Sequence, residues 1–296
     1  MALLTRIGRV YQVVAAASVL LGDAPTSAPE LLYHNSAGGY SELWRAVDGG
    51  RPARVLPAGV SAFDATASAD GAIAFMRPDR AGDLALWIRD PAGQVLRRLS
   101  PTGVDDRMPA FAPDGKRLAF VRSDAGAGST LWIASLDRGE TRSLVAASAT
   151  ILSPSWSPDG SRLAYASNQG GRFRIWMVAA NGAGARPVSD PLGADLEPCF
   201  APDGRRLVFV RQLGNGTIDL VIKDLRSGAE AVLALEGGES GPVWSPTGDR
   251  IAFASDRDGD LEIYTVRPDG SDLLKVTDND IDDTDPAWLA RPAGRR

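Results

Sequence analysis

The segment Pro154-Ser-Trp-Ser-Pro-Asp-Gly160 decides the fold, because copies of it recur at intervals of 44 or 45 residues. Clear copies are Pro109-Ala-Phe-Ala-Pro-Asp-Gly115, Pro198-Cys-Phe-Ala-Pro-Asp-Gly204 and Pro242-Val-Trp-Ser-Pro-Thr-Gly248. A degenerate copy, Ser68-Ala-Asp-Gly71, precedes them, and a sixth beginning, Pro286-Ala-Trp288, follows them. A repeat of this length indicates a propeller or a solenoid.

Most copies end in Pro-Asp-Gly, which predicts a tight hairpin turn. Proline fixes its own φ, aspartate bonds the backbone just ahead, and glycine takes the positive φ that the turn needs. Two apolar runs follow each turn, and both are short and rich in branched and aromatic residues, so we expect strands. The first runs are 72–76, 118–121, 163–166, 207–210 and 251–254, and the second runs are 84–88, 131–133, 175–178, 220–222 and 263–266.

Four strands within one such period predict one β-propeller blade per repeat. We expect an all-β fold, a six-bladed β-propeller with four antiparallel strands per blade over residues 31–289, followed by a tail at 290–296. One blade is shared, because Leu31–Asn35 and Glu42–Arg45 supply its second and third strands, and the C-terminal strand Asp285–Leu289 completes it. The other five blades begin near Phe63, Arg107, Leu152, Leu196 and Ser240.

Composition excludes several classes of protein. The 296 residues are 44% apolar and 23% charged, which fits a globular core and excludes disorder as the main state. With 32 Lys and Arg against 37 Asp and Glu, the net charge of -5 offers no basic field to nucleic acid. A single cysteine, Cys199, excludes an internal disulfide, and a single histidine, His34, excludes a multi-histidine metal cluster.

Residues 1–30 allow two interpretations. Arg6 and Arg9 precede an apolar stretch, Val10–Leu21, which has the shape of a secretory signal. The alternative is an amphipathic N-terminal helix on the domain. The stretch is too short to cross a bilayer comfortably, so no membrane span is expected. A signal would place the protein in the periplasm or outside the cell, whereas a helix leaves a cytoplasmic location open.

The pattern Pro-x-Trp/Phe-Ser/Ala-Pro-Asp-Gly-x-x-Leu/Ile-Ala-Phe, followed by a Gly-rich hairpin and Ile/Leu-Trp/Tyr, resembles the WD40-like repeat of the TolB-type six-bladed propellers. The resemblance covers residues 31–289. It implies the same fold and a role in binding a protein or peptide in the bacterial envelope, as in the periplasmic Tol-Pal system. The α/β domain that precedes the propeller in TolB is not expected, since about thirty residues come before the first repeat.

We expect ligands on the face opposite the Pro-Asp-Gly turns, around the central channel. Aligned on the repeat proline, the residues three before it are Ala62, Asp106, Ile151, Asp195, Glu239 and Asp283, and those one before it are Asp64, Met108, Ser153, Glu197, Gly241 and Asp285. A ring of carboxylates favours a cation, a basic peptide or a polyhydroxylated ligand. The alternative is a set of solvated loop residues. The candidate ligand-binding residues are Asp106, Asp195, Glu197, Glu239, Asp283 and Asp285.

Acidic residues are densest in Asp256-Arg-Asp-Gly-Asp-Leu-Glu262 and in residues 278–285, both expected on the same face. Oxygen ligands at alternating positions suit calcium. The candidate metal ligands are Asp256, Asp258, Asp260 and Asp280. Ordinary hairpin chemistry also explains an Asp-Gly pair. No cofactor is required, and calcium is the one that the sequence allows.

His34 is the candidate catalytic base, with Asp64 or Asp283 as the carboxylate that would orient it. The alternative is a surface or hydrogen-bonding histidine, since no Gly-x-Ser-x-Gly elbow, phosphate loop or dinucleotide motif accompanies it. Small residues replace Cys199 in the other repeats, so we expect it to pack rather than to react. The tryptophans occupy two repeat positions and are interpreted as core residues.

The leading hypothesis is a monomeric, non-enzymatic module that binds a protein or a basic peptide at the channel mouth, without nucleic acid or a membrane span. The alternative is an enzyme that acts on a carbohydrate or other small molecule through mouth carboxylates, with or without a metal. Propeller lyases of pectin fragments resemble this fold but use histidine-rich metal sites. A structural scaffold is a third hypothesis, because fold does not choose between these functions.

Overall fold

The computed structural model describes residues 30–37, 40–46, 52–79, 82–93, 96–124, 128–147, 149–190 and 192–289. The N-terminal segment, for which the sequence allows a signal or a helix, falls outside these ranges, and so does the tail at 290–296. Both expectations stay predictions.

The described strands form six four-stranded antiparallel sheets, and in each blade the strand named first is the innermost. Blade 1 consists of β24 (Asp283–Leu289), β1 (Glu30–Ala37), β2 (Tyr40–Ala46) and β3 (Ala53–Arg54). Blade 2 consists of β4 (Phe63–Ala67), β5 (Ile73–Pro78), β6 (Leu84–Arg89) and β7 (Leu96–Arg98). Blade 3 consists of β8 (Asp105–Phe111), β9 (Arg117–Asp124), β10 (Gly128–Ser135) and β11 (Glu140–Ala147).

The remaining three blades follow the same order. Blade 4 consists of β12 (Ile151–Trp156), β13 (Arg162–Ser167), β14 (Arg174–Ala179) and β15 (Arg186–Pro187). Blade 5 consists of β16 (Ala194–Phe200), β17 (Arg206–Gln212), β18 (Ile218–Asp224) and β19 (Glu230–Leu233). Blade 6 consists of β20 (Glu239–Trp244), β21 (Ile251–Ser255), β22 (Glu262–Val266) and β23 (Leu274–Lys275).

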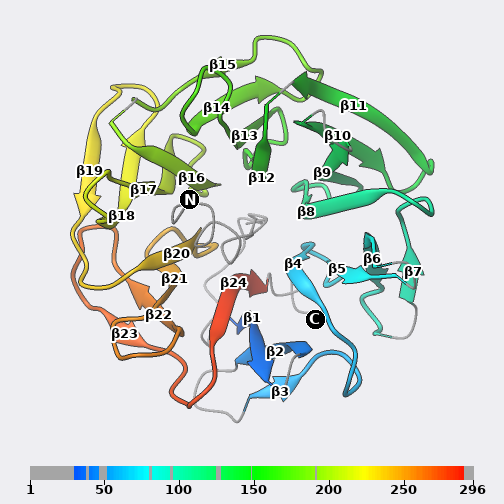
Figure 1. The fold of residues 1–296 in the computed structure, drawn as a ribbon, viewed down its shortest axis with the longest axis horizontal. Coiled ribbons are helices and arrows are strands. Elements are labelled where there is room, and N and C mark those ends of the chain that lie inside the picture. Colours follow the sequence, from blue (N-terminus) through cyan, green and yellow to red (C-terminus); the bar gives the residue numbers. More distant parts are fainter. Residues whose placement is uncertain are drawn as a thin grey trace, which may run out of the picture.

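The blades are arranged in a ring, with β4, β8, β12, β16, β20 and β24 around the centre (Figure 1). No helix occurs among the described residues. The predicted all-β, six-bladed β-propeller is therefore confirmed. Among these same residues, no helical segment has the length and hydropathy that a membrane crossing needs.

Blade 1 joins segments from opposite ends of the sequence. β24 pairs antiparallel with β1, so that Glu30 lies opposite Leu289 and Leu31 lies opposite Trp288. The side-chain amide of Asn35 donates to Asp283 Oδ1 at 2.8 Å, although 248 positions separate the two residues. The predicted closure of the ring by the C-terminal strand is confirmed, and this strand begins two residues earlier than predicted.

The apolar core lies between neighbouring blades. The aromatic ring at the end of an inner strand reaches back over the preceding blade, as Trp156 and Trp288 show. Trp156 Nε1 donates to the Ala110 carbonyl at 3.1 Å, and Trp288 Nε1 donates to the Val243 carbonyl at 3.2 Å. Burying rings of this size contributes strongly to stability. The inner-strand tryptophans are core residues, as the repeat spacing predicts, whereas the third-strand tryptophans are only half-buried: Trp44, Trp87, Trp132 and Trp176.

The channel has two ends, which we name by what they carry. The turn face carries the turns between inner and second strands, such as residues 113–115. The channel-mouth face carries the starts of the inner strands and the hairpins between second and third strands. This distinction follows from the antiparallel order within each blade, and it decides which residues can form one site.

Deleting residues from Asp285 onward removes most of β24. We expect thermal stability to collapse, because blade 1 loses its inner strand and Trp288 no longer covers the inner strand of blade 6. Thermal unfolding followed by circular dichroism measures the effect. If the shortened chain melted like the full chain, β24 would not be what closes the ring.

Candidate functional site

Each inner strand carries a β-bulge at the same repeat position. The pairing register between inner and second strands shifts there in all six blades. A residue with φ between 46° and 59° lies in each bulge: Asp64, Met108, Ser153, Glu197, Gly241 and Asp285. A non-glycine residue in this region costs about 1–3 kcal/mol. Contacts from the surrounding blades must therefore hold five of these six residues in place.

Side chains of one blade bond the bulged backbone of the next. Glu197 Oε2 accepts a hydrogen bond of 2.6 Å from the Gly241 N–H. Met108 Sδ faces the Ser153 N–H at 3.2 Å. The carboxylate of Glu197 is therefore a buried acceptor that links blade 5 to blade 6.

Two carboxylates at the channel mouth form bidentate ion pairs with arginines of the second strand of their own blade. Asp106 accepts from Arg122 Nε at 2.7 Å and from Nη2 at 2.9 Å. Asp195 accepts from Arg211 Nε at 2.7 Å and from Nη2 at 3.0 Å. Each arginine lies directly opposite its aspartate in the strand pairing. Bidentate geometry of this kind gives strong charge-assisted hydrogen bonds. Burial by itself would lower the pKa of Arg211, but Asp195 and Glu230 outweigh it and raise that pKa.

Two further carboxylates at the mouth also have partners. Glu239 Oε1 lies 3.3 Å from Arg257 Nη2, and burial raises the pKa of Glu239 to about 8. Asp283 accepts from the side-chain amides of Asn35 and Asn279, each at 2.8 Å. Burial raises the pKa of Asp283 to about 6 against the effect of these amides. The four mouth acids therefore bond to arginine and amide groups of the propeller itself.

Glu197 of blade 5 acts on Asp64 of blade 2 from the opposite side of the ring. Burial raises the pKa of Asp64 to about 8, with the charge of Glu197 as the second cause and Arg107 acting in the opposite direction. Burial also raises the pKa of Glu197 to about 7, against the hydrogen bond from Gly241. Asp64 Oδ2 has no hydrogen-bond partner within the described residues. Near neutral pH Asp64 retains a proton that an exposed carboxylic acid has lost, and Glu197 is partly protonated.

Blade 6 carries the acids that reach solvent on the channel-mouth face. The exposed ones come from the hairpin between β21 and β22 and from the segments before β20 and β24: Glu236, Asp256, Asp258, Asp278, Asp280 and Asp282. A cavity of about 390 Å³ beside three of them is lined by Glu236, Gly237, Asp256, Arg257 and Asp258. Asp256 Oδ1 accepts from the Gly238 N–H at 2.7 Å. Asp258 accepts from the Tyr264 hydroxyl and lies 3.3 Å from Lys275 Nζ.

The four predicted calcium ligands are all on blade 6 or beside it. Asp256 and Asp258 line the same cavity, whereas Asp260 and Asp280 are not among its lining residues. Within the part of the chain that the structure describes, no three His, Cys, Asp or Glu side chains lie close enough to hold a metal ion. Calcium binding stays a prediction.

His34 is buried and serves as a hydrogen-bond acceptor. Its Nε2 accepts from the Ala65 N–H at 3.1 Å, which ties blade 1 to blade 2. Burial lowers the pKa of His34 to about 4, so the imidazole is neutral at physiological pH. Within the described residues, neither Asp64 nor Asp283 hydrogen-bonds to it. Cys199 is buried too, and burial raises the pKa of its thiol to about 12.

Comparison with protein families decides where this propeller belongs. The model of the TolB beta propeller domain matches residues 106–234 and 194–295, which together span more than half of the chain. The chain belongs to this family. Comparison with curated protein sequences gave no match.

Solved structures share the TolB propeller fold at low sequence identity. TolB from Acinetobacter baumannii is 18% identical, with a TM-score of 0.77 over 91% of this chain and 68% of that one. Hydrazine synthase from Kuenenia stuttgartiensis is 16% identical, with a TM-score of 0.74 over 91% and 48%. An oligogalacturonate lyase from Vibrio parahaemolyticus is 13% identical, with a TM-score of 0.61 over 91% and 77%. At such identities the likeness shows the fold alone.

For this member of the TolB propeller family, the sequence indicates the acids at the mouth but not all of their partners. Arg122 and Arg211 recur at the repeat position opposite Asp106 and Asp195, and this recurrence is the sequence signal for the two ion pairs. Arg257 gives no such signal, because it lies in a hairpin beyond the repeat position. The partner of such a hairpin residue is known only once the pairing of the strands is known.

Asp195→Ala should destabilise the propeller by about 2–3 kcal/mol, because the buried guanidinium of Arg211 loses its bidentate partner and keeps only Glu230. Chemical denaturation measures the free energy of unfolding. Asp190→Ala is the matched control, since the Asp190 side chain is 61% exposed and lies 3.4 Å from Lys223. We expect the control to change stability by about 1 kcal/mol or less. Equal losses in the two variants would contradict a structural role for the mouth pair.

Stability should fall as the pH rises from about 6.5 to about 8. The folded pKa values of Asp64, Glu197 and Glu239, about 8, about 7 and about 8, lie above those of unfolded carboxylic acids. The folded state therefore binds extra protons, and it loses this advantage as they dissociate. His34 adds no slope here, because its folded pKa is lowered to about 4 and its contribution is complete above its unfolded value.

Denaturant midpoints across this pH range measure the slope, and Asp64→Asn should make it shallower, leaving the part that Glu197 and Glu239 contribute. Asp137→Asn is the control, since the Ser135 hydroxyl lowers the pKa of Asp137 and this group titrates below the range. A flat wild-type profile, or an Asp64→Asn profile as steep as the wild type, would show that Asp64 does not retain its proton.

Proposed function

We propose that this propeller is a non-enzymatic binding module that takes a basic segment of a partner protein on the channel-mouth face of blade 6. The observation that carries the proposal is a set of exposed carboxylates on this face, three of which line the cavity of about 390 Å³. We refer to this set as the acidic rim, and it consists of Glu236, Asp256, Asp258, Asp278, Asp280 and Asp282.

The acidic rim keeps negative charge that the rest of the mouth has lost. Asp106 and Asp195 are buried and bonded to arginines, so they offer little charge to a ligand. On the rim, by contrast, Lys275 is shared among Asp258, Asp278 and Glu262 at 3.3, 2.6 and 3.9 Å. One cation cannot neutralise three carboxylates. The remaining field attracts a basic partner and speeds its association.

The cavity in the acidic rim suits a cationic side chain. Its own arginine, Arg257, lies 3.3 Å from Glu239 and 4.6 Å from the centre of the Tyr264 ring. The charge of Arg257 is therefore paired within the protein. A lysine or arginine of the partner would meet Asp256 and Asp258 at the cavity wall.

Membership of the TolB propeller family supports a binding role and an envelope location. The resemblance to TolB implies protein or peptide binding in the periplasm. Arg6 and Arg9, followed by the apolar stretch Val10–Leu21, support export to the periplasm or secretion. Both points belong to this proposal.

An enzyme is the second candidate, and the pair Asp64 and Glu197 favours it. Two carboxylic acids with raised pKa values in a channel could act as general acid and base on a carbohydrate. Both are nearly inaccessible, with 2% and 4% of their surface exposed, and Glu197 already bonds Gly241. For this reason the enzyme ranks second. Turnover of an oligosaccharide by the wild type, abolished in Asp64→Asn, would reverse the order.

Isothermal titration of the full chain with an amidated peptide of alternating lysine and alanine tests the binding role. We expect binding that weakens as salt is added, because exposed charges are screened. The double variant Asp256→Asn, Asp258→Asn should weaken binding about fivefold or more, since two charge-assisted contacts are lost. An asparagine side chain keeps an oxygen that can accept the hydrogen bond from the Gly238 N–H, so the hairpin should fold.

The matched control is Glu140→Gln, an exposed carboxylate of blade 3 on the turn face. It should bind the peptide like the wild type. Equal binding by the double variant, or equal binding of a glutamate–alanine peptide, would refute the acidic rim as the site. Adding calcium to the same titrations tests the metal hypothesis, because calcium at Asp258 would compete with the peptide.

A further inference from the structure

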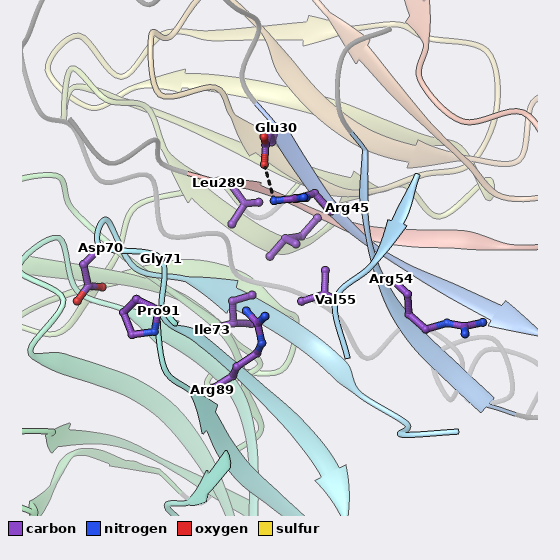
Figure 2. A pocket seen from close by; sticks show the side chains of 11 residues that line it. Glu30, Arg45, Arg54, Val55, Asp70, Gly71, Ile73, Arg89, Pro91 and Leu289 are labelled. Atoms are coloured by element: carbon purple, nitrogen blue, oxygen red, sulfur yellow. Dashed lines mark ion pairs between the residues drawn. The ribbon is translucent and has the colours of Figure 1, made fainter. Parts of the chain in front are cut away.

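A second, larger cavity opens on the turn face between blades 1 and 2, away from the acidic rim. Its volume is about 640 Å³, and its apolar wall is formed by Leu32, Val55, Ile73 and Leu289. Figure 2 shows these side chains together with Glu30, Arg45, Arg54, Asp70, Gly71, Arg89 and Pro91. We refer to this cavity as the seam pocket, because it lies where the ring closes.

The seam pocket exists because blade 1 has no hairpin between its inner and second strands. In blades 3 to 6, the glycine of each turn packs on the turn of the preceding blade. A Cβ on Gly160 would lie 3.7 Å from Pro113, and one on Gly204 would lie 3.6 Å from Pro158. In blade 1 the two strands come from opposite ends of the sequence. Gly71 of blade 2 therefore faces the seam pocket instead of a turn.

An aromatic ring that the other blades carry is missing next to the seam pocket. Five inner strands end in an aromatic residue that pairs with an apolar residue at the start of the second strand: Phe111, Trp156, Phe200, Trp244 and Trp288. In blade 2 the corresponding residue is Ala67, which pairs with Ile73. Where Trp156 or Trp288 is present, it reaches the inner strand of the preceding blade. Ala67 is 3% exposed and is not among the residues that line the seam pocket, but it leaves no ring beside Ile73, which does line it.

An arginine without an ion-pair partner among the described residues stands at the same seam. Arg89 pairs with Ile73 in the sheet. The corresponding residues of the other blades are apolar or paired: Ala46, Ala134, Val178, Val266, and Lys223, which lies 3.0 Å from Glu230.

The other two arginines that line the pocket form ion pairs within the protein. Arg45 pairs with Glu30 at 3.3 Å, and Arg54 pairs with Glu42 at 2.8 Å. Figure 2 shows Arg89 extending beside Ile73 toward Val55, whereas Arg54 points away. Since Arg89 forms no ion pair within the described part of the chain, its charge is open to a ligand.

We propose that the seam pocket binds a small aromatic carboxylate. The ring of the ligand takes the place of the aromatic side chain that Ala67 lacks, against Ile73 and Leu289, and its carboxylate pairs with Arg89. A ring and an anion together match an apolar wall with one convergent cation. The volume is within the range of small-molecule sites, about 300–1,000 Å³. This site is independent of the acidic rim and of its proposed peptide.

Isothermal titration of the full chain with indole-3-propionate tests the proposal. We expect binding, and we expect the uncharged amide of the same compound to bind about tenfold more weakly or worse, because the charge-assisted pair is lost. Arg89→Ala restores the residue type of Ala134 and should lower affinity to a similar extent. Arg97→Ala, an exposed arginine of the outer strand of the same blade, is the matched control and should bind like the wild type.

Ala67→Trp restores the aromatic residue of the repeat and should fill the seam pocket. We expect it to fold, with an unchanged or higher melting temperature, and to lose indole-3-propionate binding. Ala67→Phe is the second variant should the larger ring not be accommodated. The absence of binding in the wild type would overturn the proposal. Binding that is unaffected by Arg89→Ala and by both Ala67 variants would overturn it equally.

Discussion

The pairing of β24 with β1 is the contact on which the whole ring depends. Every other blade is a local unit, made of four consecutive strands joined by short hairpins. Blade 1 alone requires two segments from opposite ends of the sequence, and 248 positions separate Asn35 from Asp283. Closing so long a chain costs conformational entropy before any contact forms. Once it is closed, each blade has a neighbour on both sides, and its two apolar faces are covered.

Closure also makes the ring unequal. Four interfaces have a turn packed on a turn, whereas the two beside blade 1 do not, because its inner and second strands are not connected by a hairpin. The seam pocket lies at one of these two. On the opposite face, Asp106 and Asp195 are neutralised by arginines of their own blades, but the acids of blade 6 project from connecting segments into solvent. The seam pocket therefore lies where the repeat is broken, and the acidic rim lies where the acids have no arginine of the repeat opposite them.

Burial explains how most mouth acids are held within the propeller. A carboxylate removed from water must be paired, hydrogen-bonded or protonated. Asp195 is paired with Arg211, Glu197 is hydrogen-bonded to the Gly241 N–H, and Asp64 is protonated, with a pKa of about 8. Each of these arrangements uses the charge that a partner would need. Only acids that remain in solvent, such as Asp256, keep that charge for recognition.

The fold could be predicted from the sequence because the signals for its turns and strands are local. Pro-Asp-Gly turns and apolar runs depend on a few adjacent residues, and their period was enough to predict six blades and the shared one. The carboxylates at the mouth could be located by the same alignment, but their partners could not all be found, because Arg257 meets Glu239 only through folding. The alignment did contain Ala67 and Arg89 as departures from the repeat. That these two departures lie at one pocket is known only from the pairing of both residues with Ile73 and from the absence of a turn between the inner and second strands of blade 1.

Native-state hydrogen exchange of β1 and β24 tests the closure most directly. If the seam holds the ring together, opening it unfolds the molecule, and the amides of Leu31, Leu32 and Ala287 exchange only through global unfolding. Their free energies of exchange should then equal those of the inner strands of blades 3 to 5. Exchange of β1 and β24 at a much lower free energy, while the other blades stay protected, would show that the propeller does not depend on this pairing.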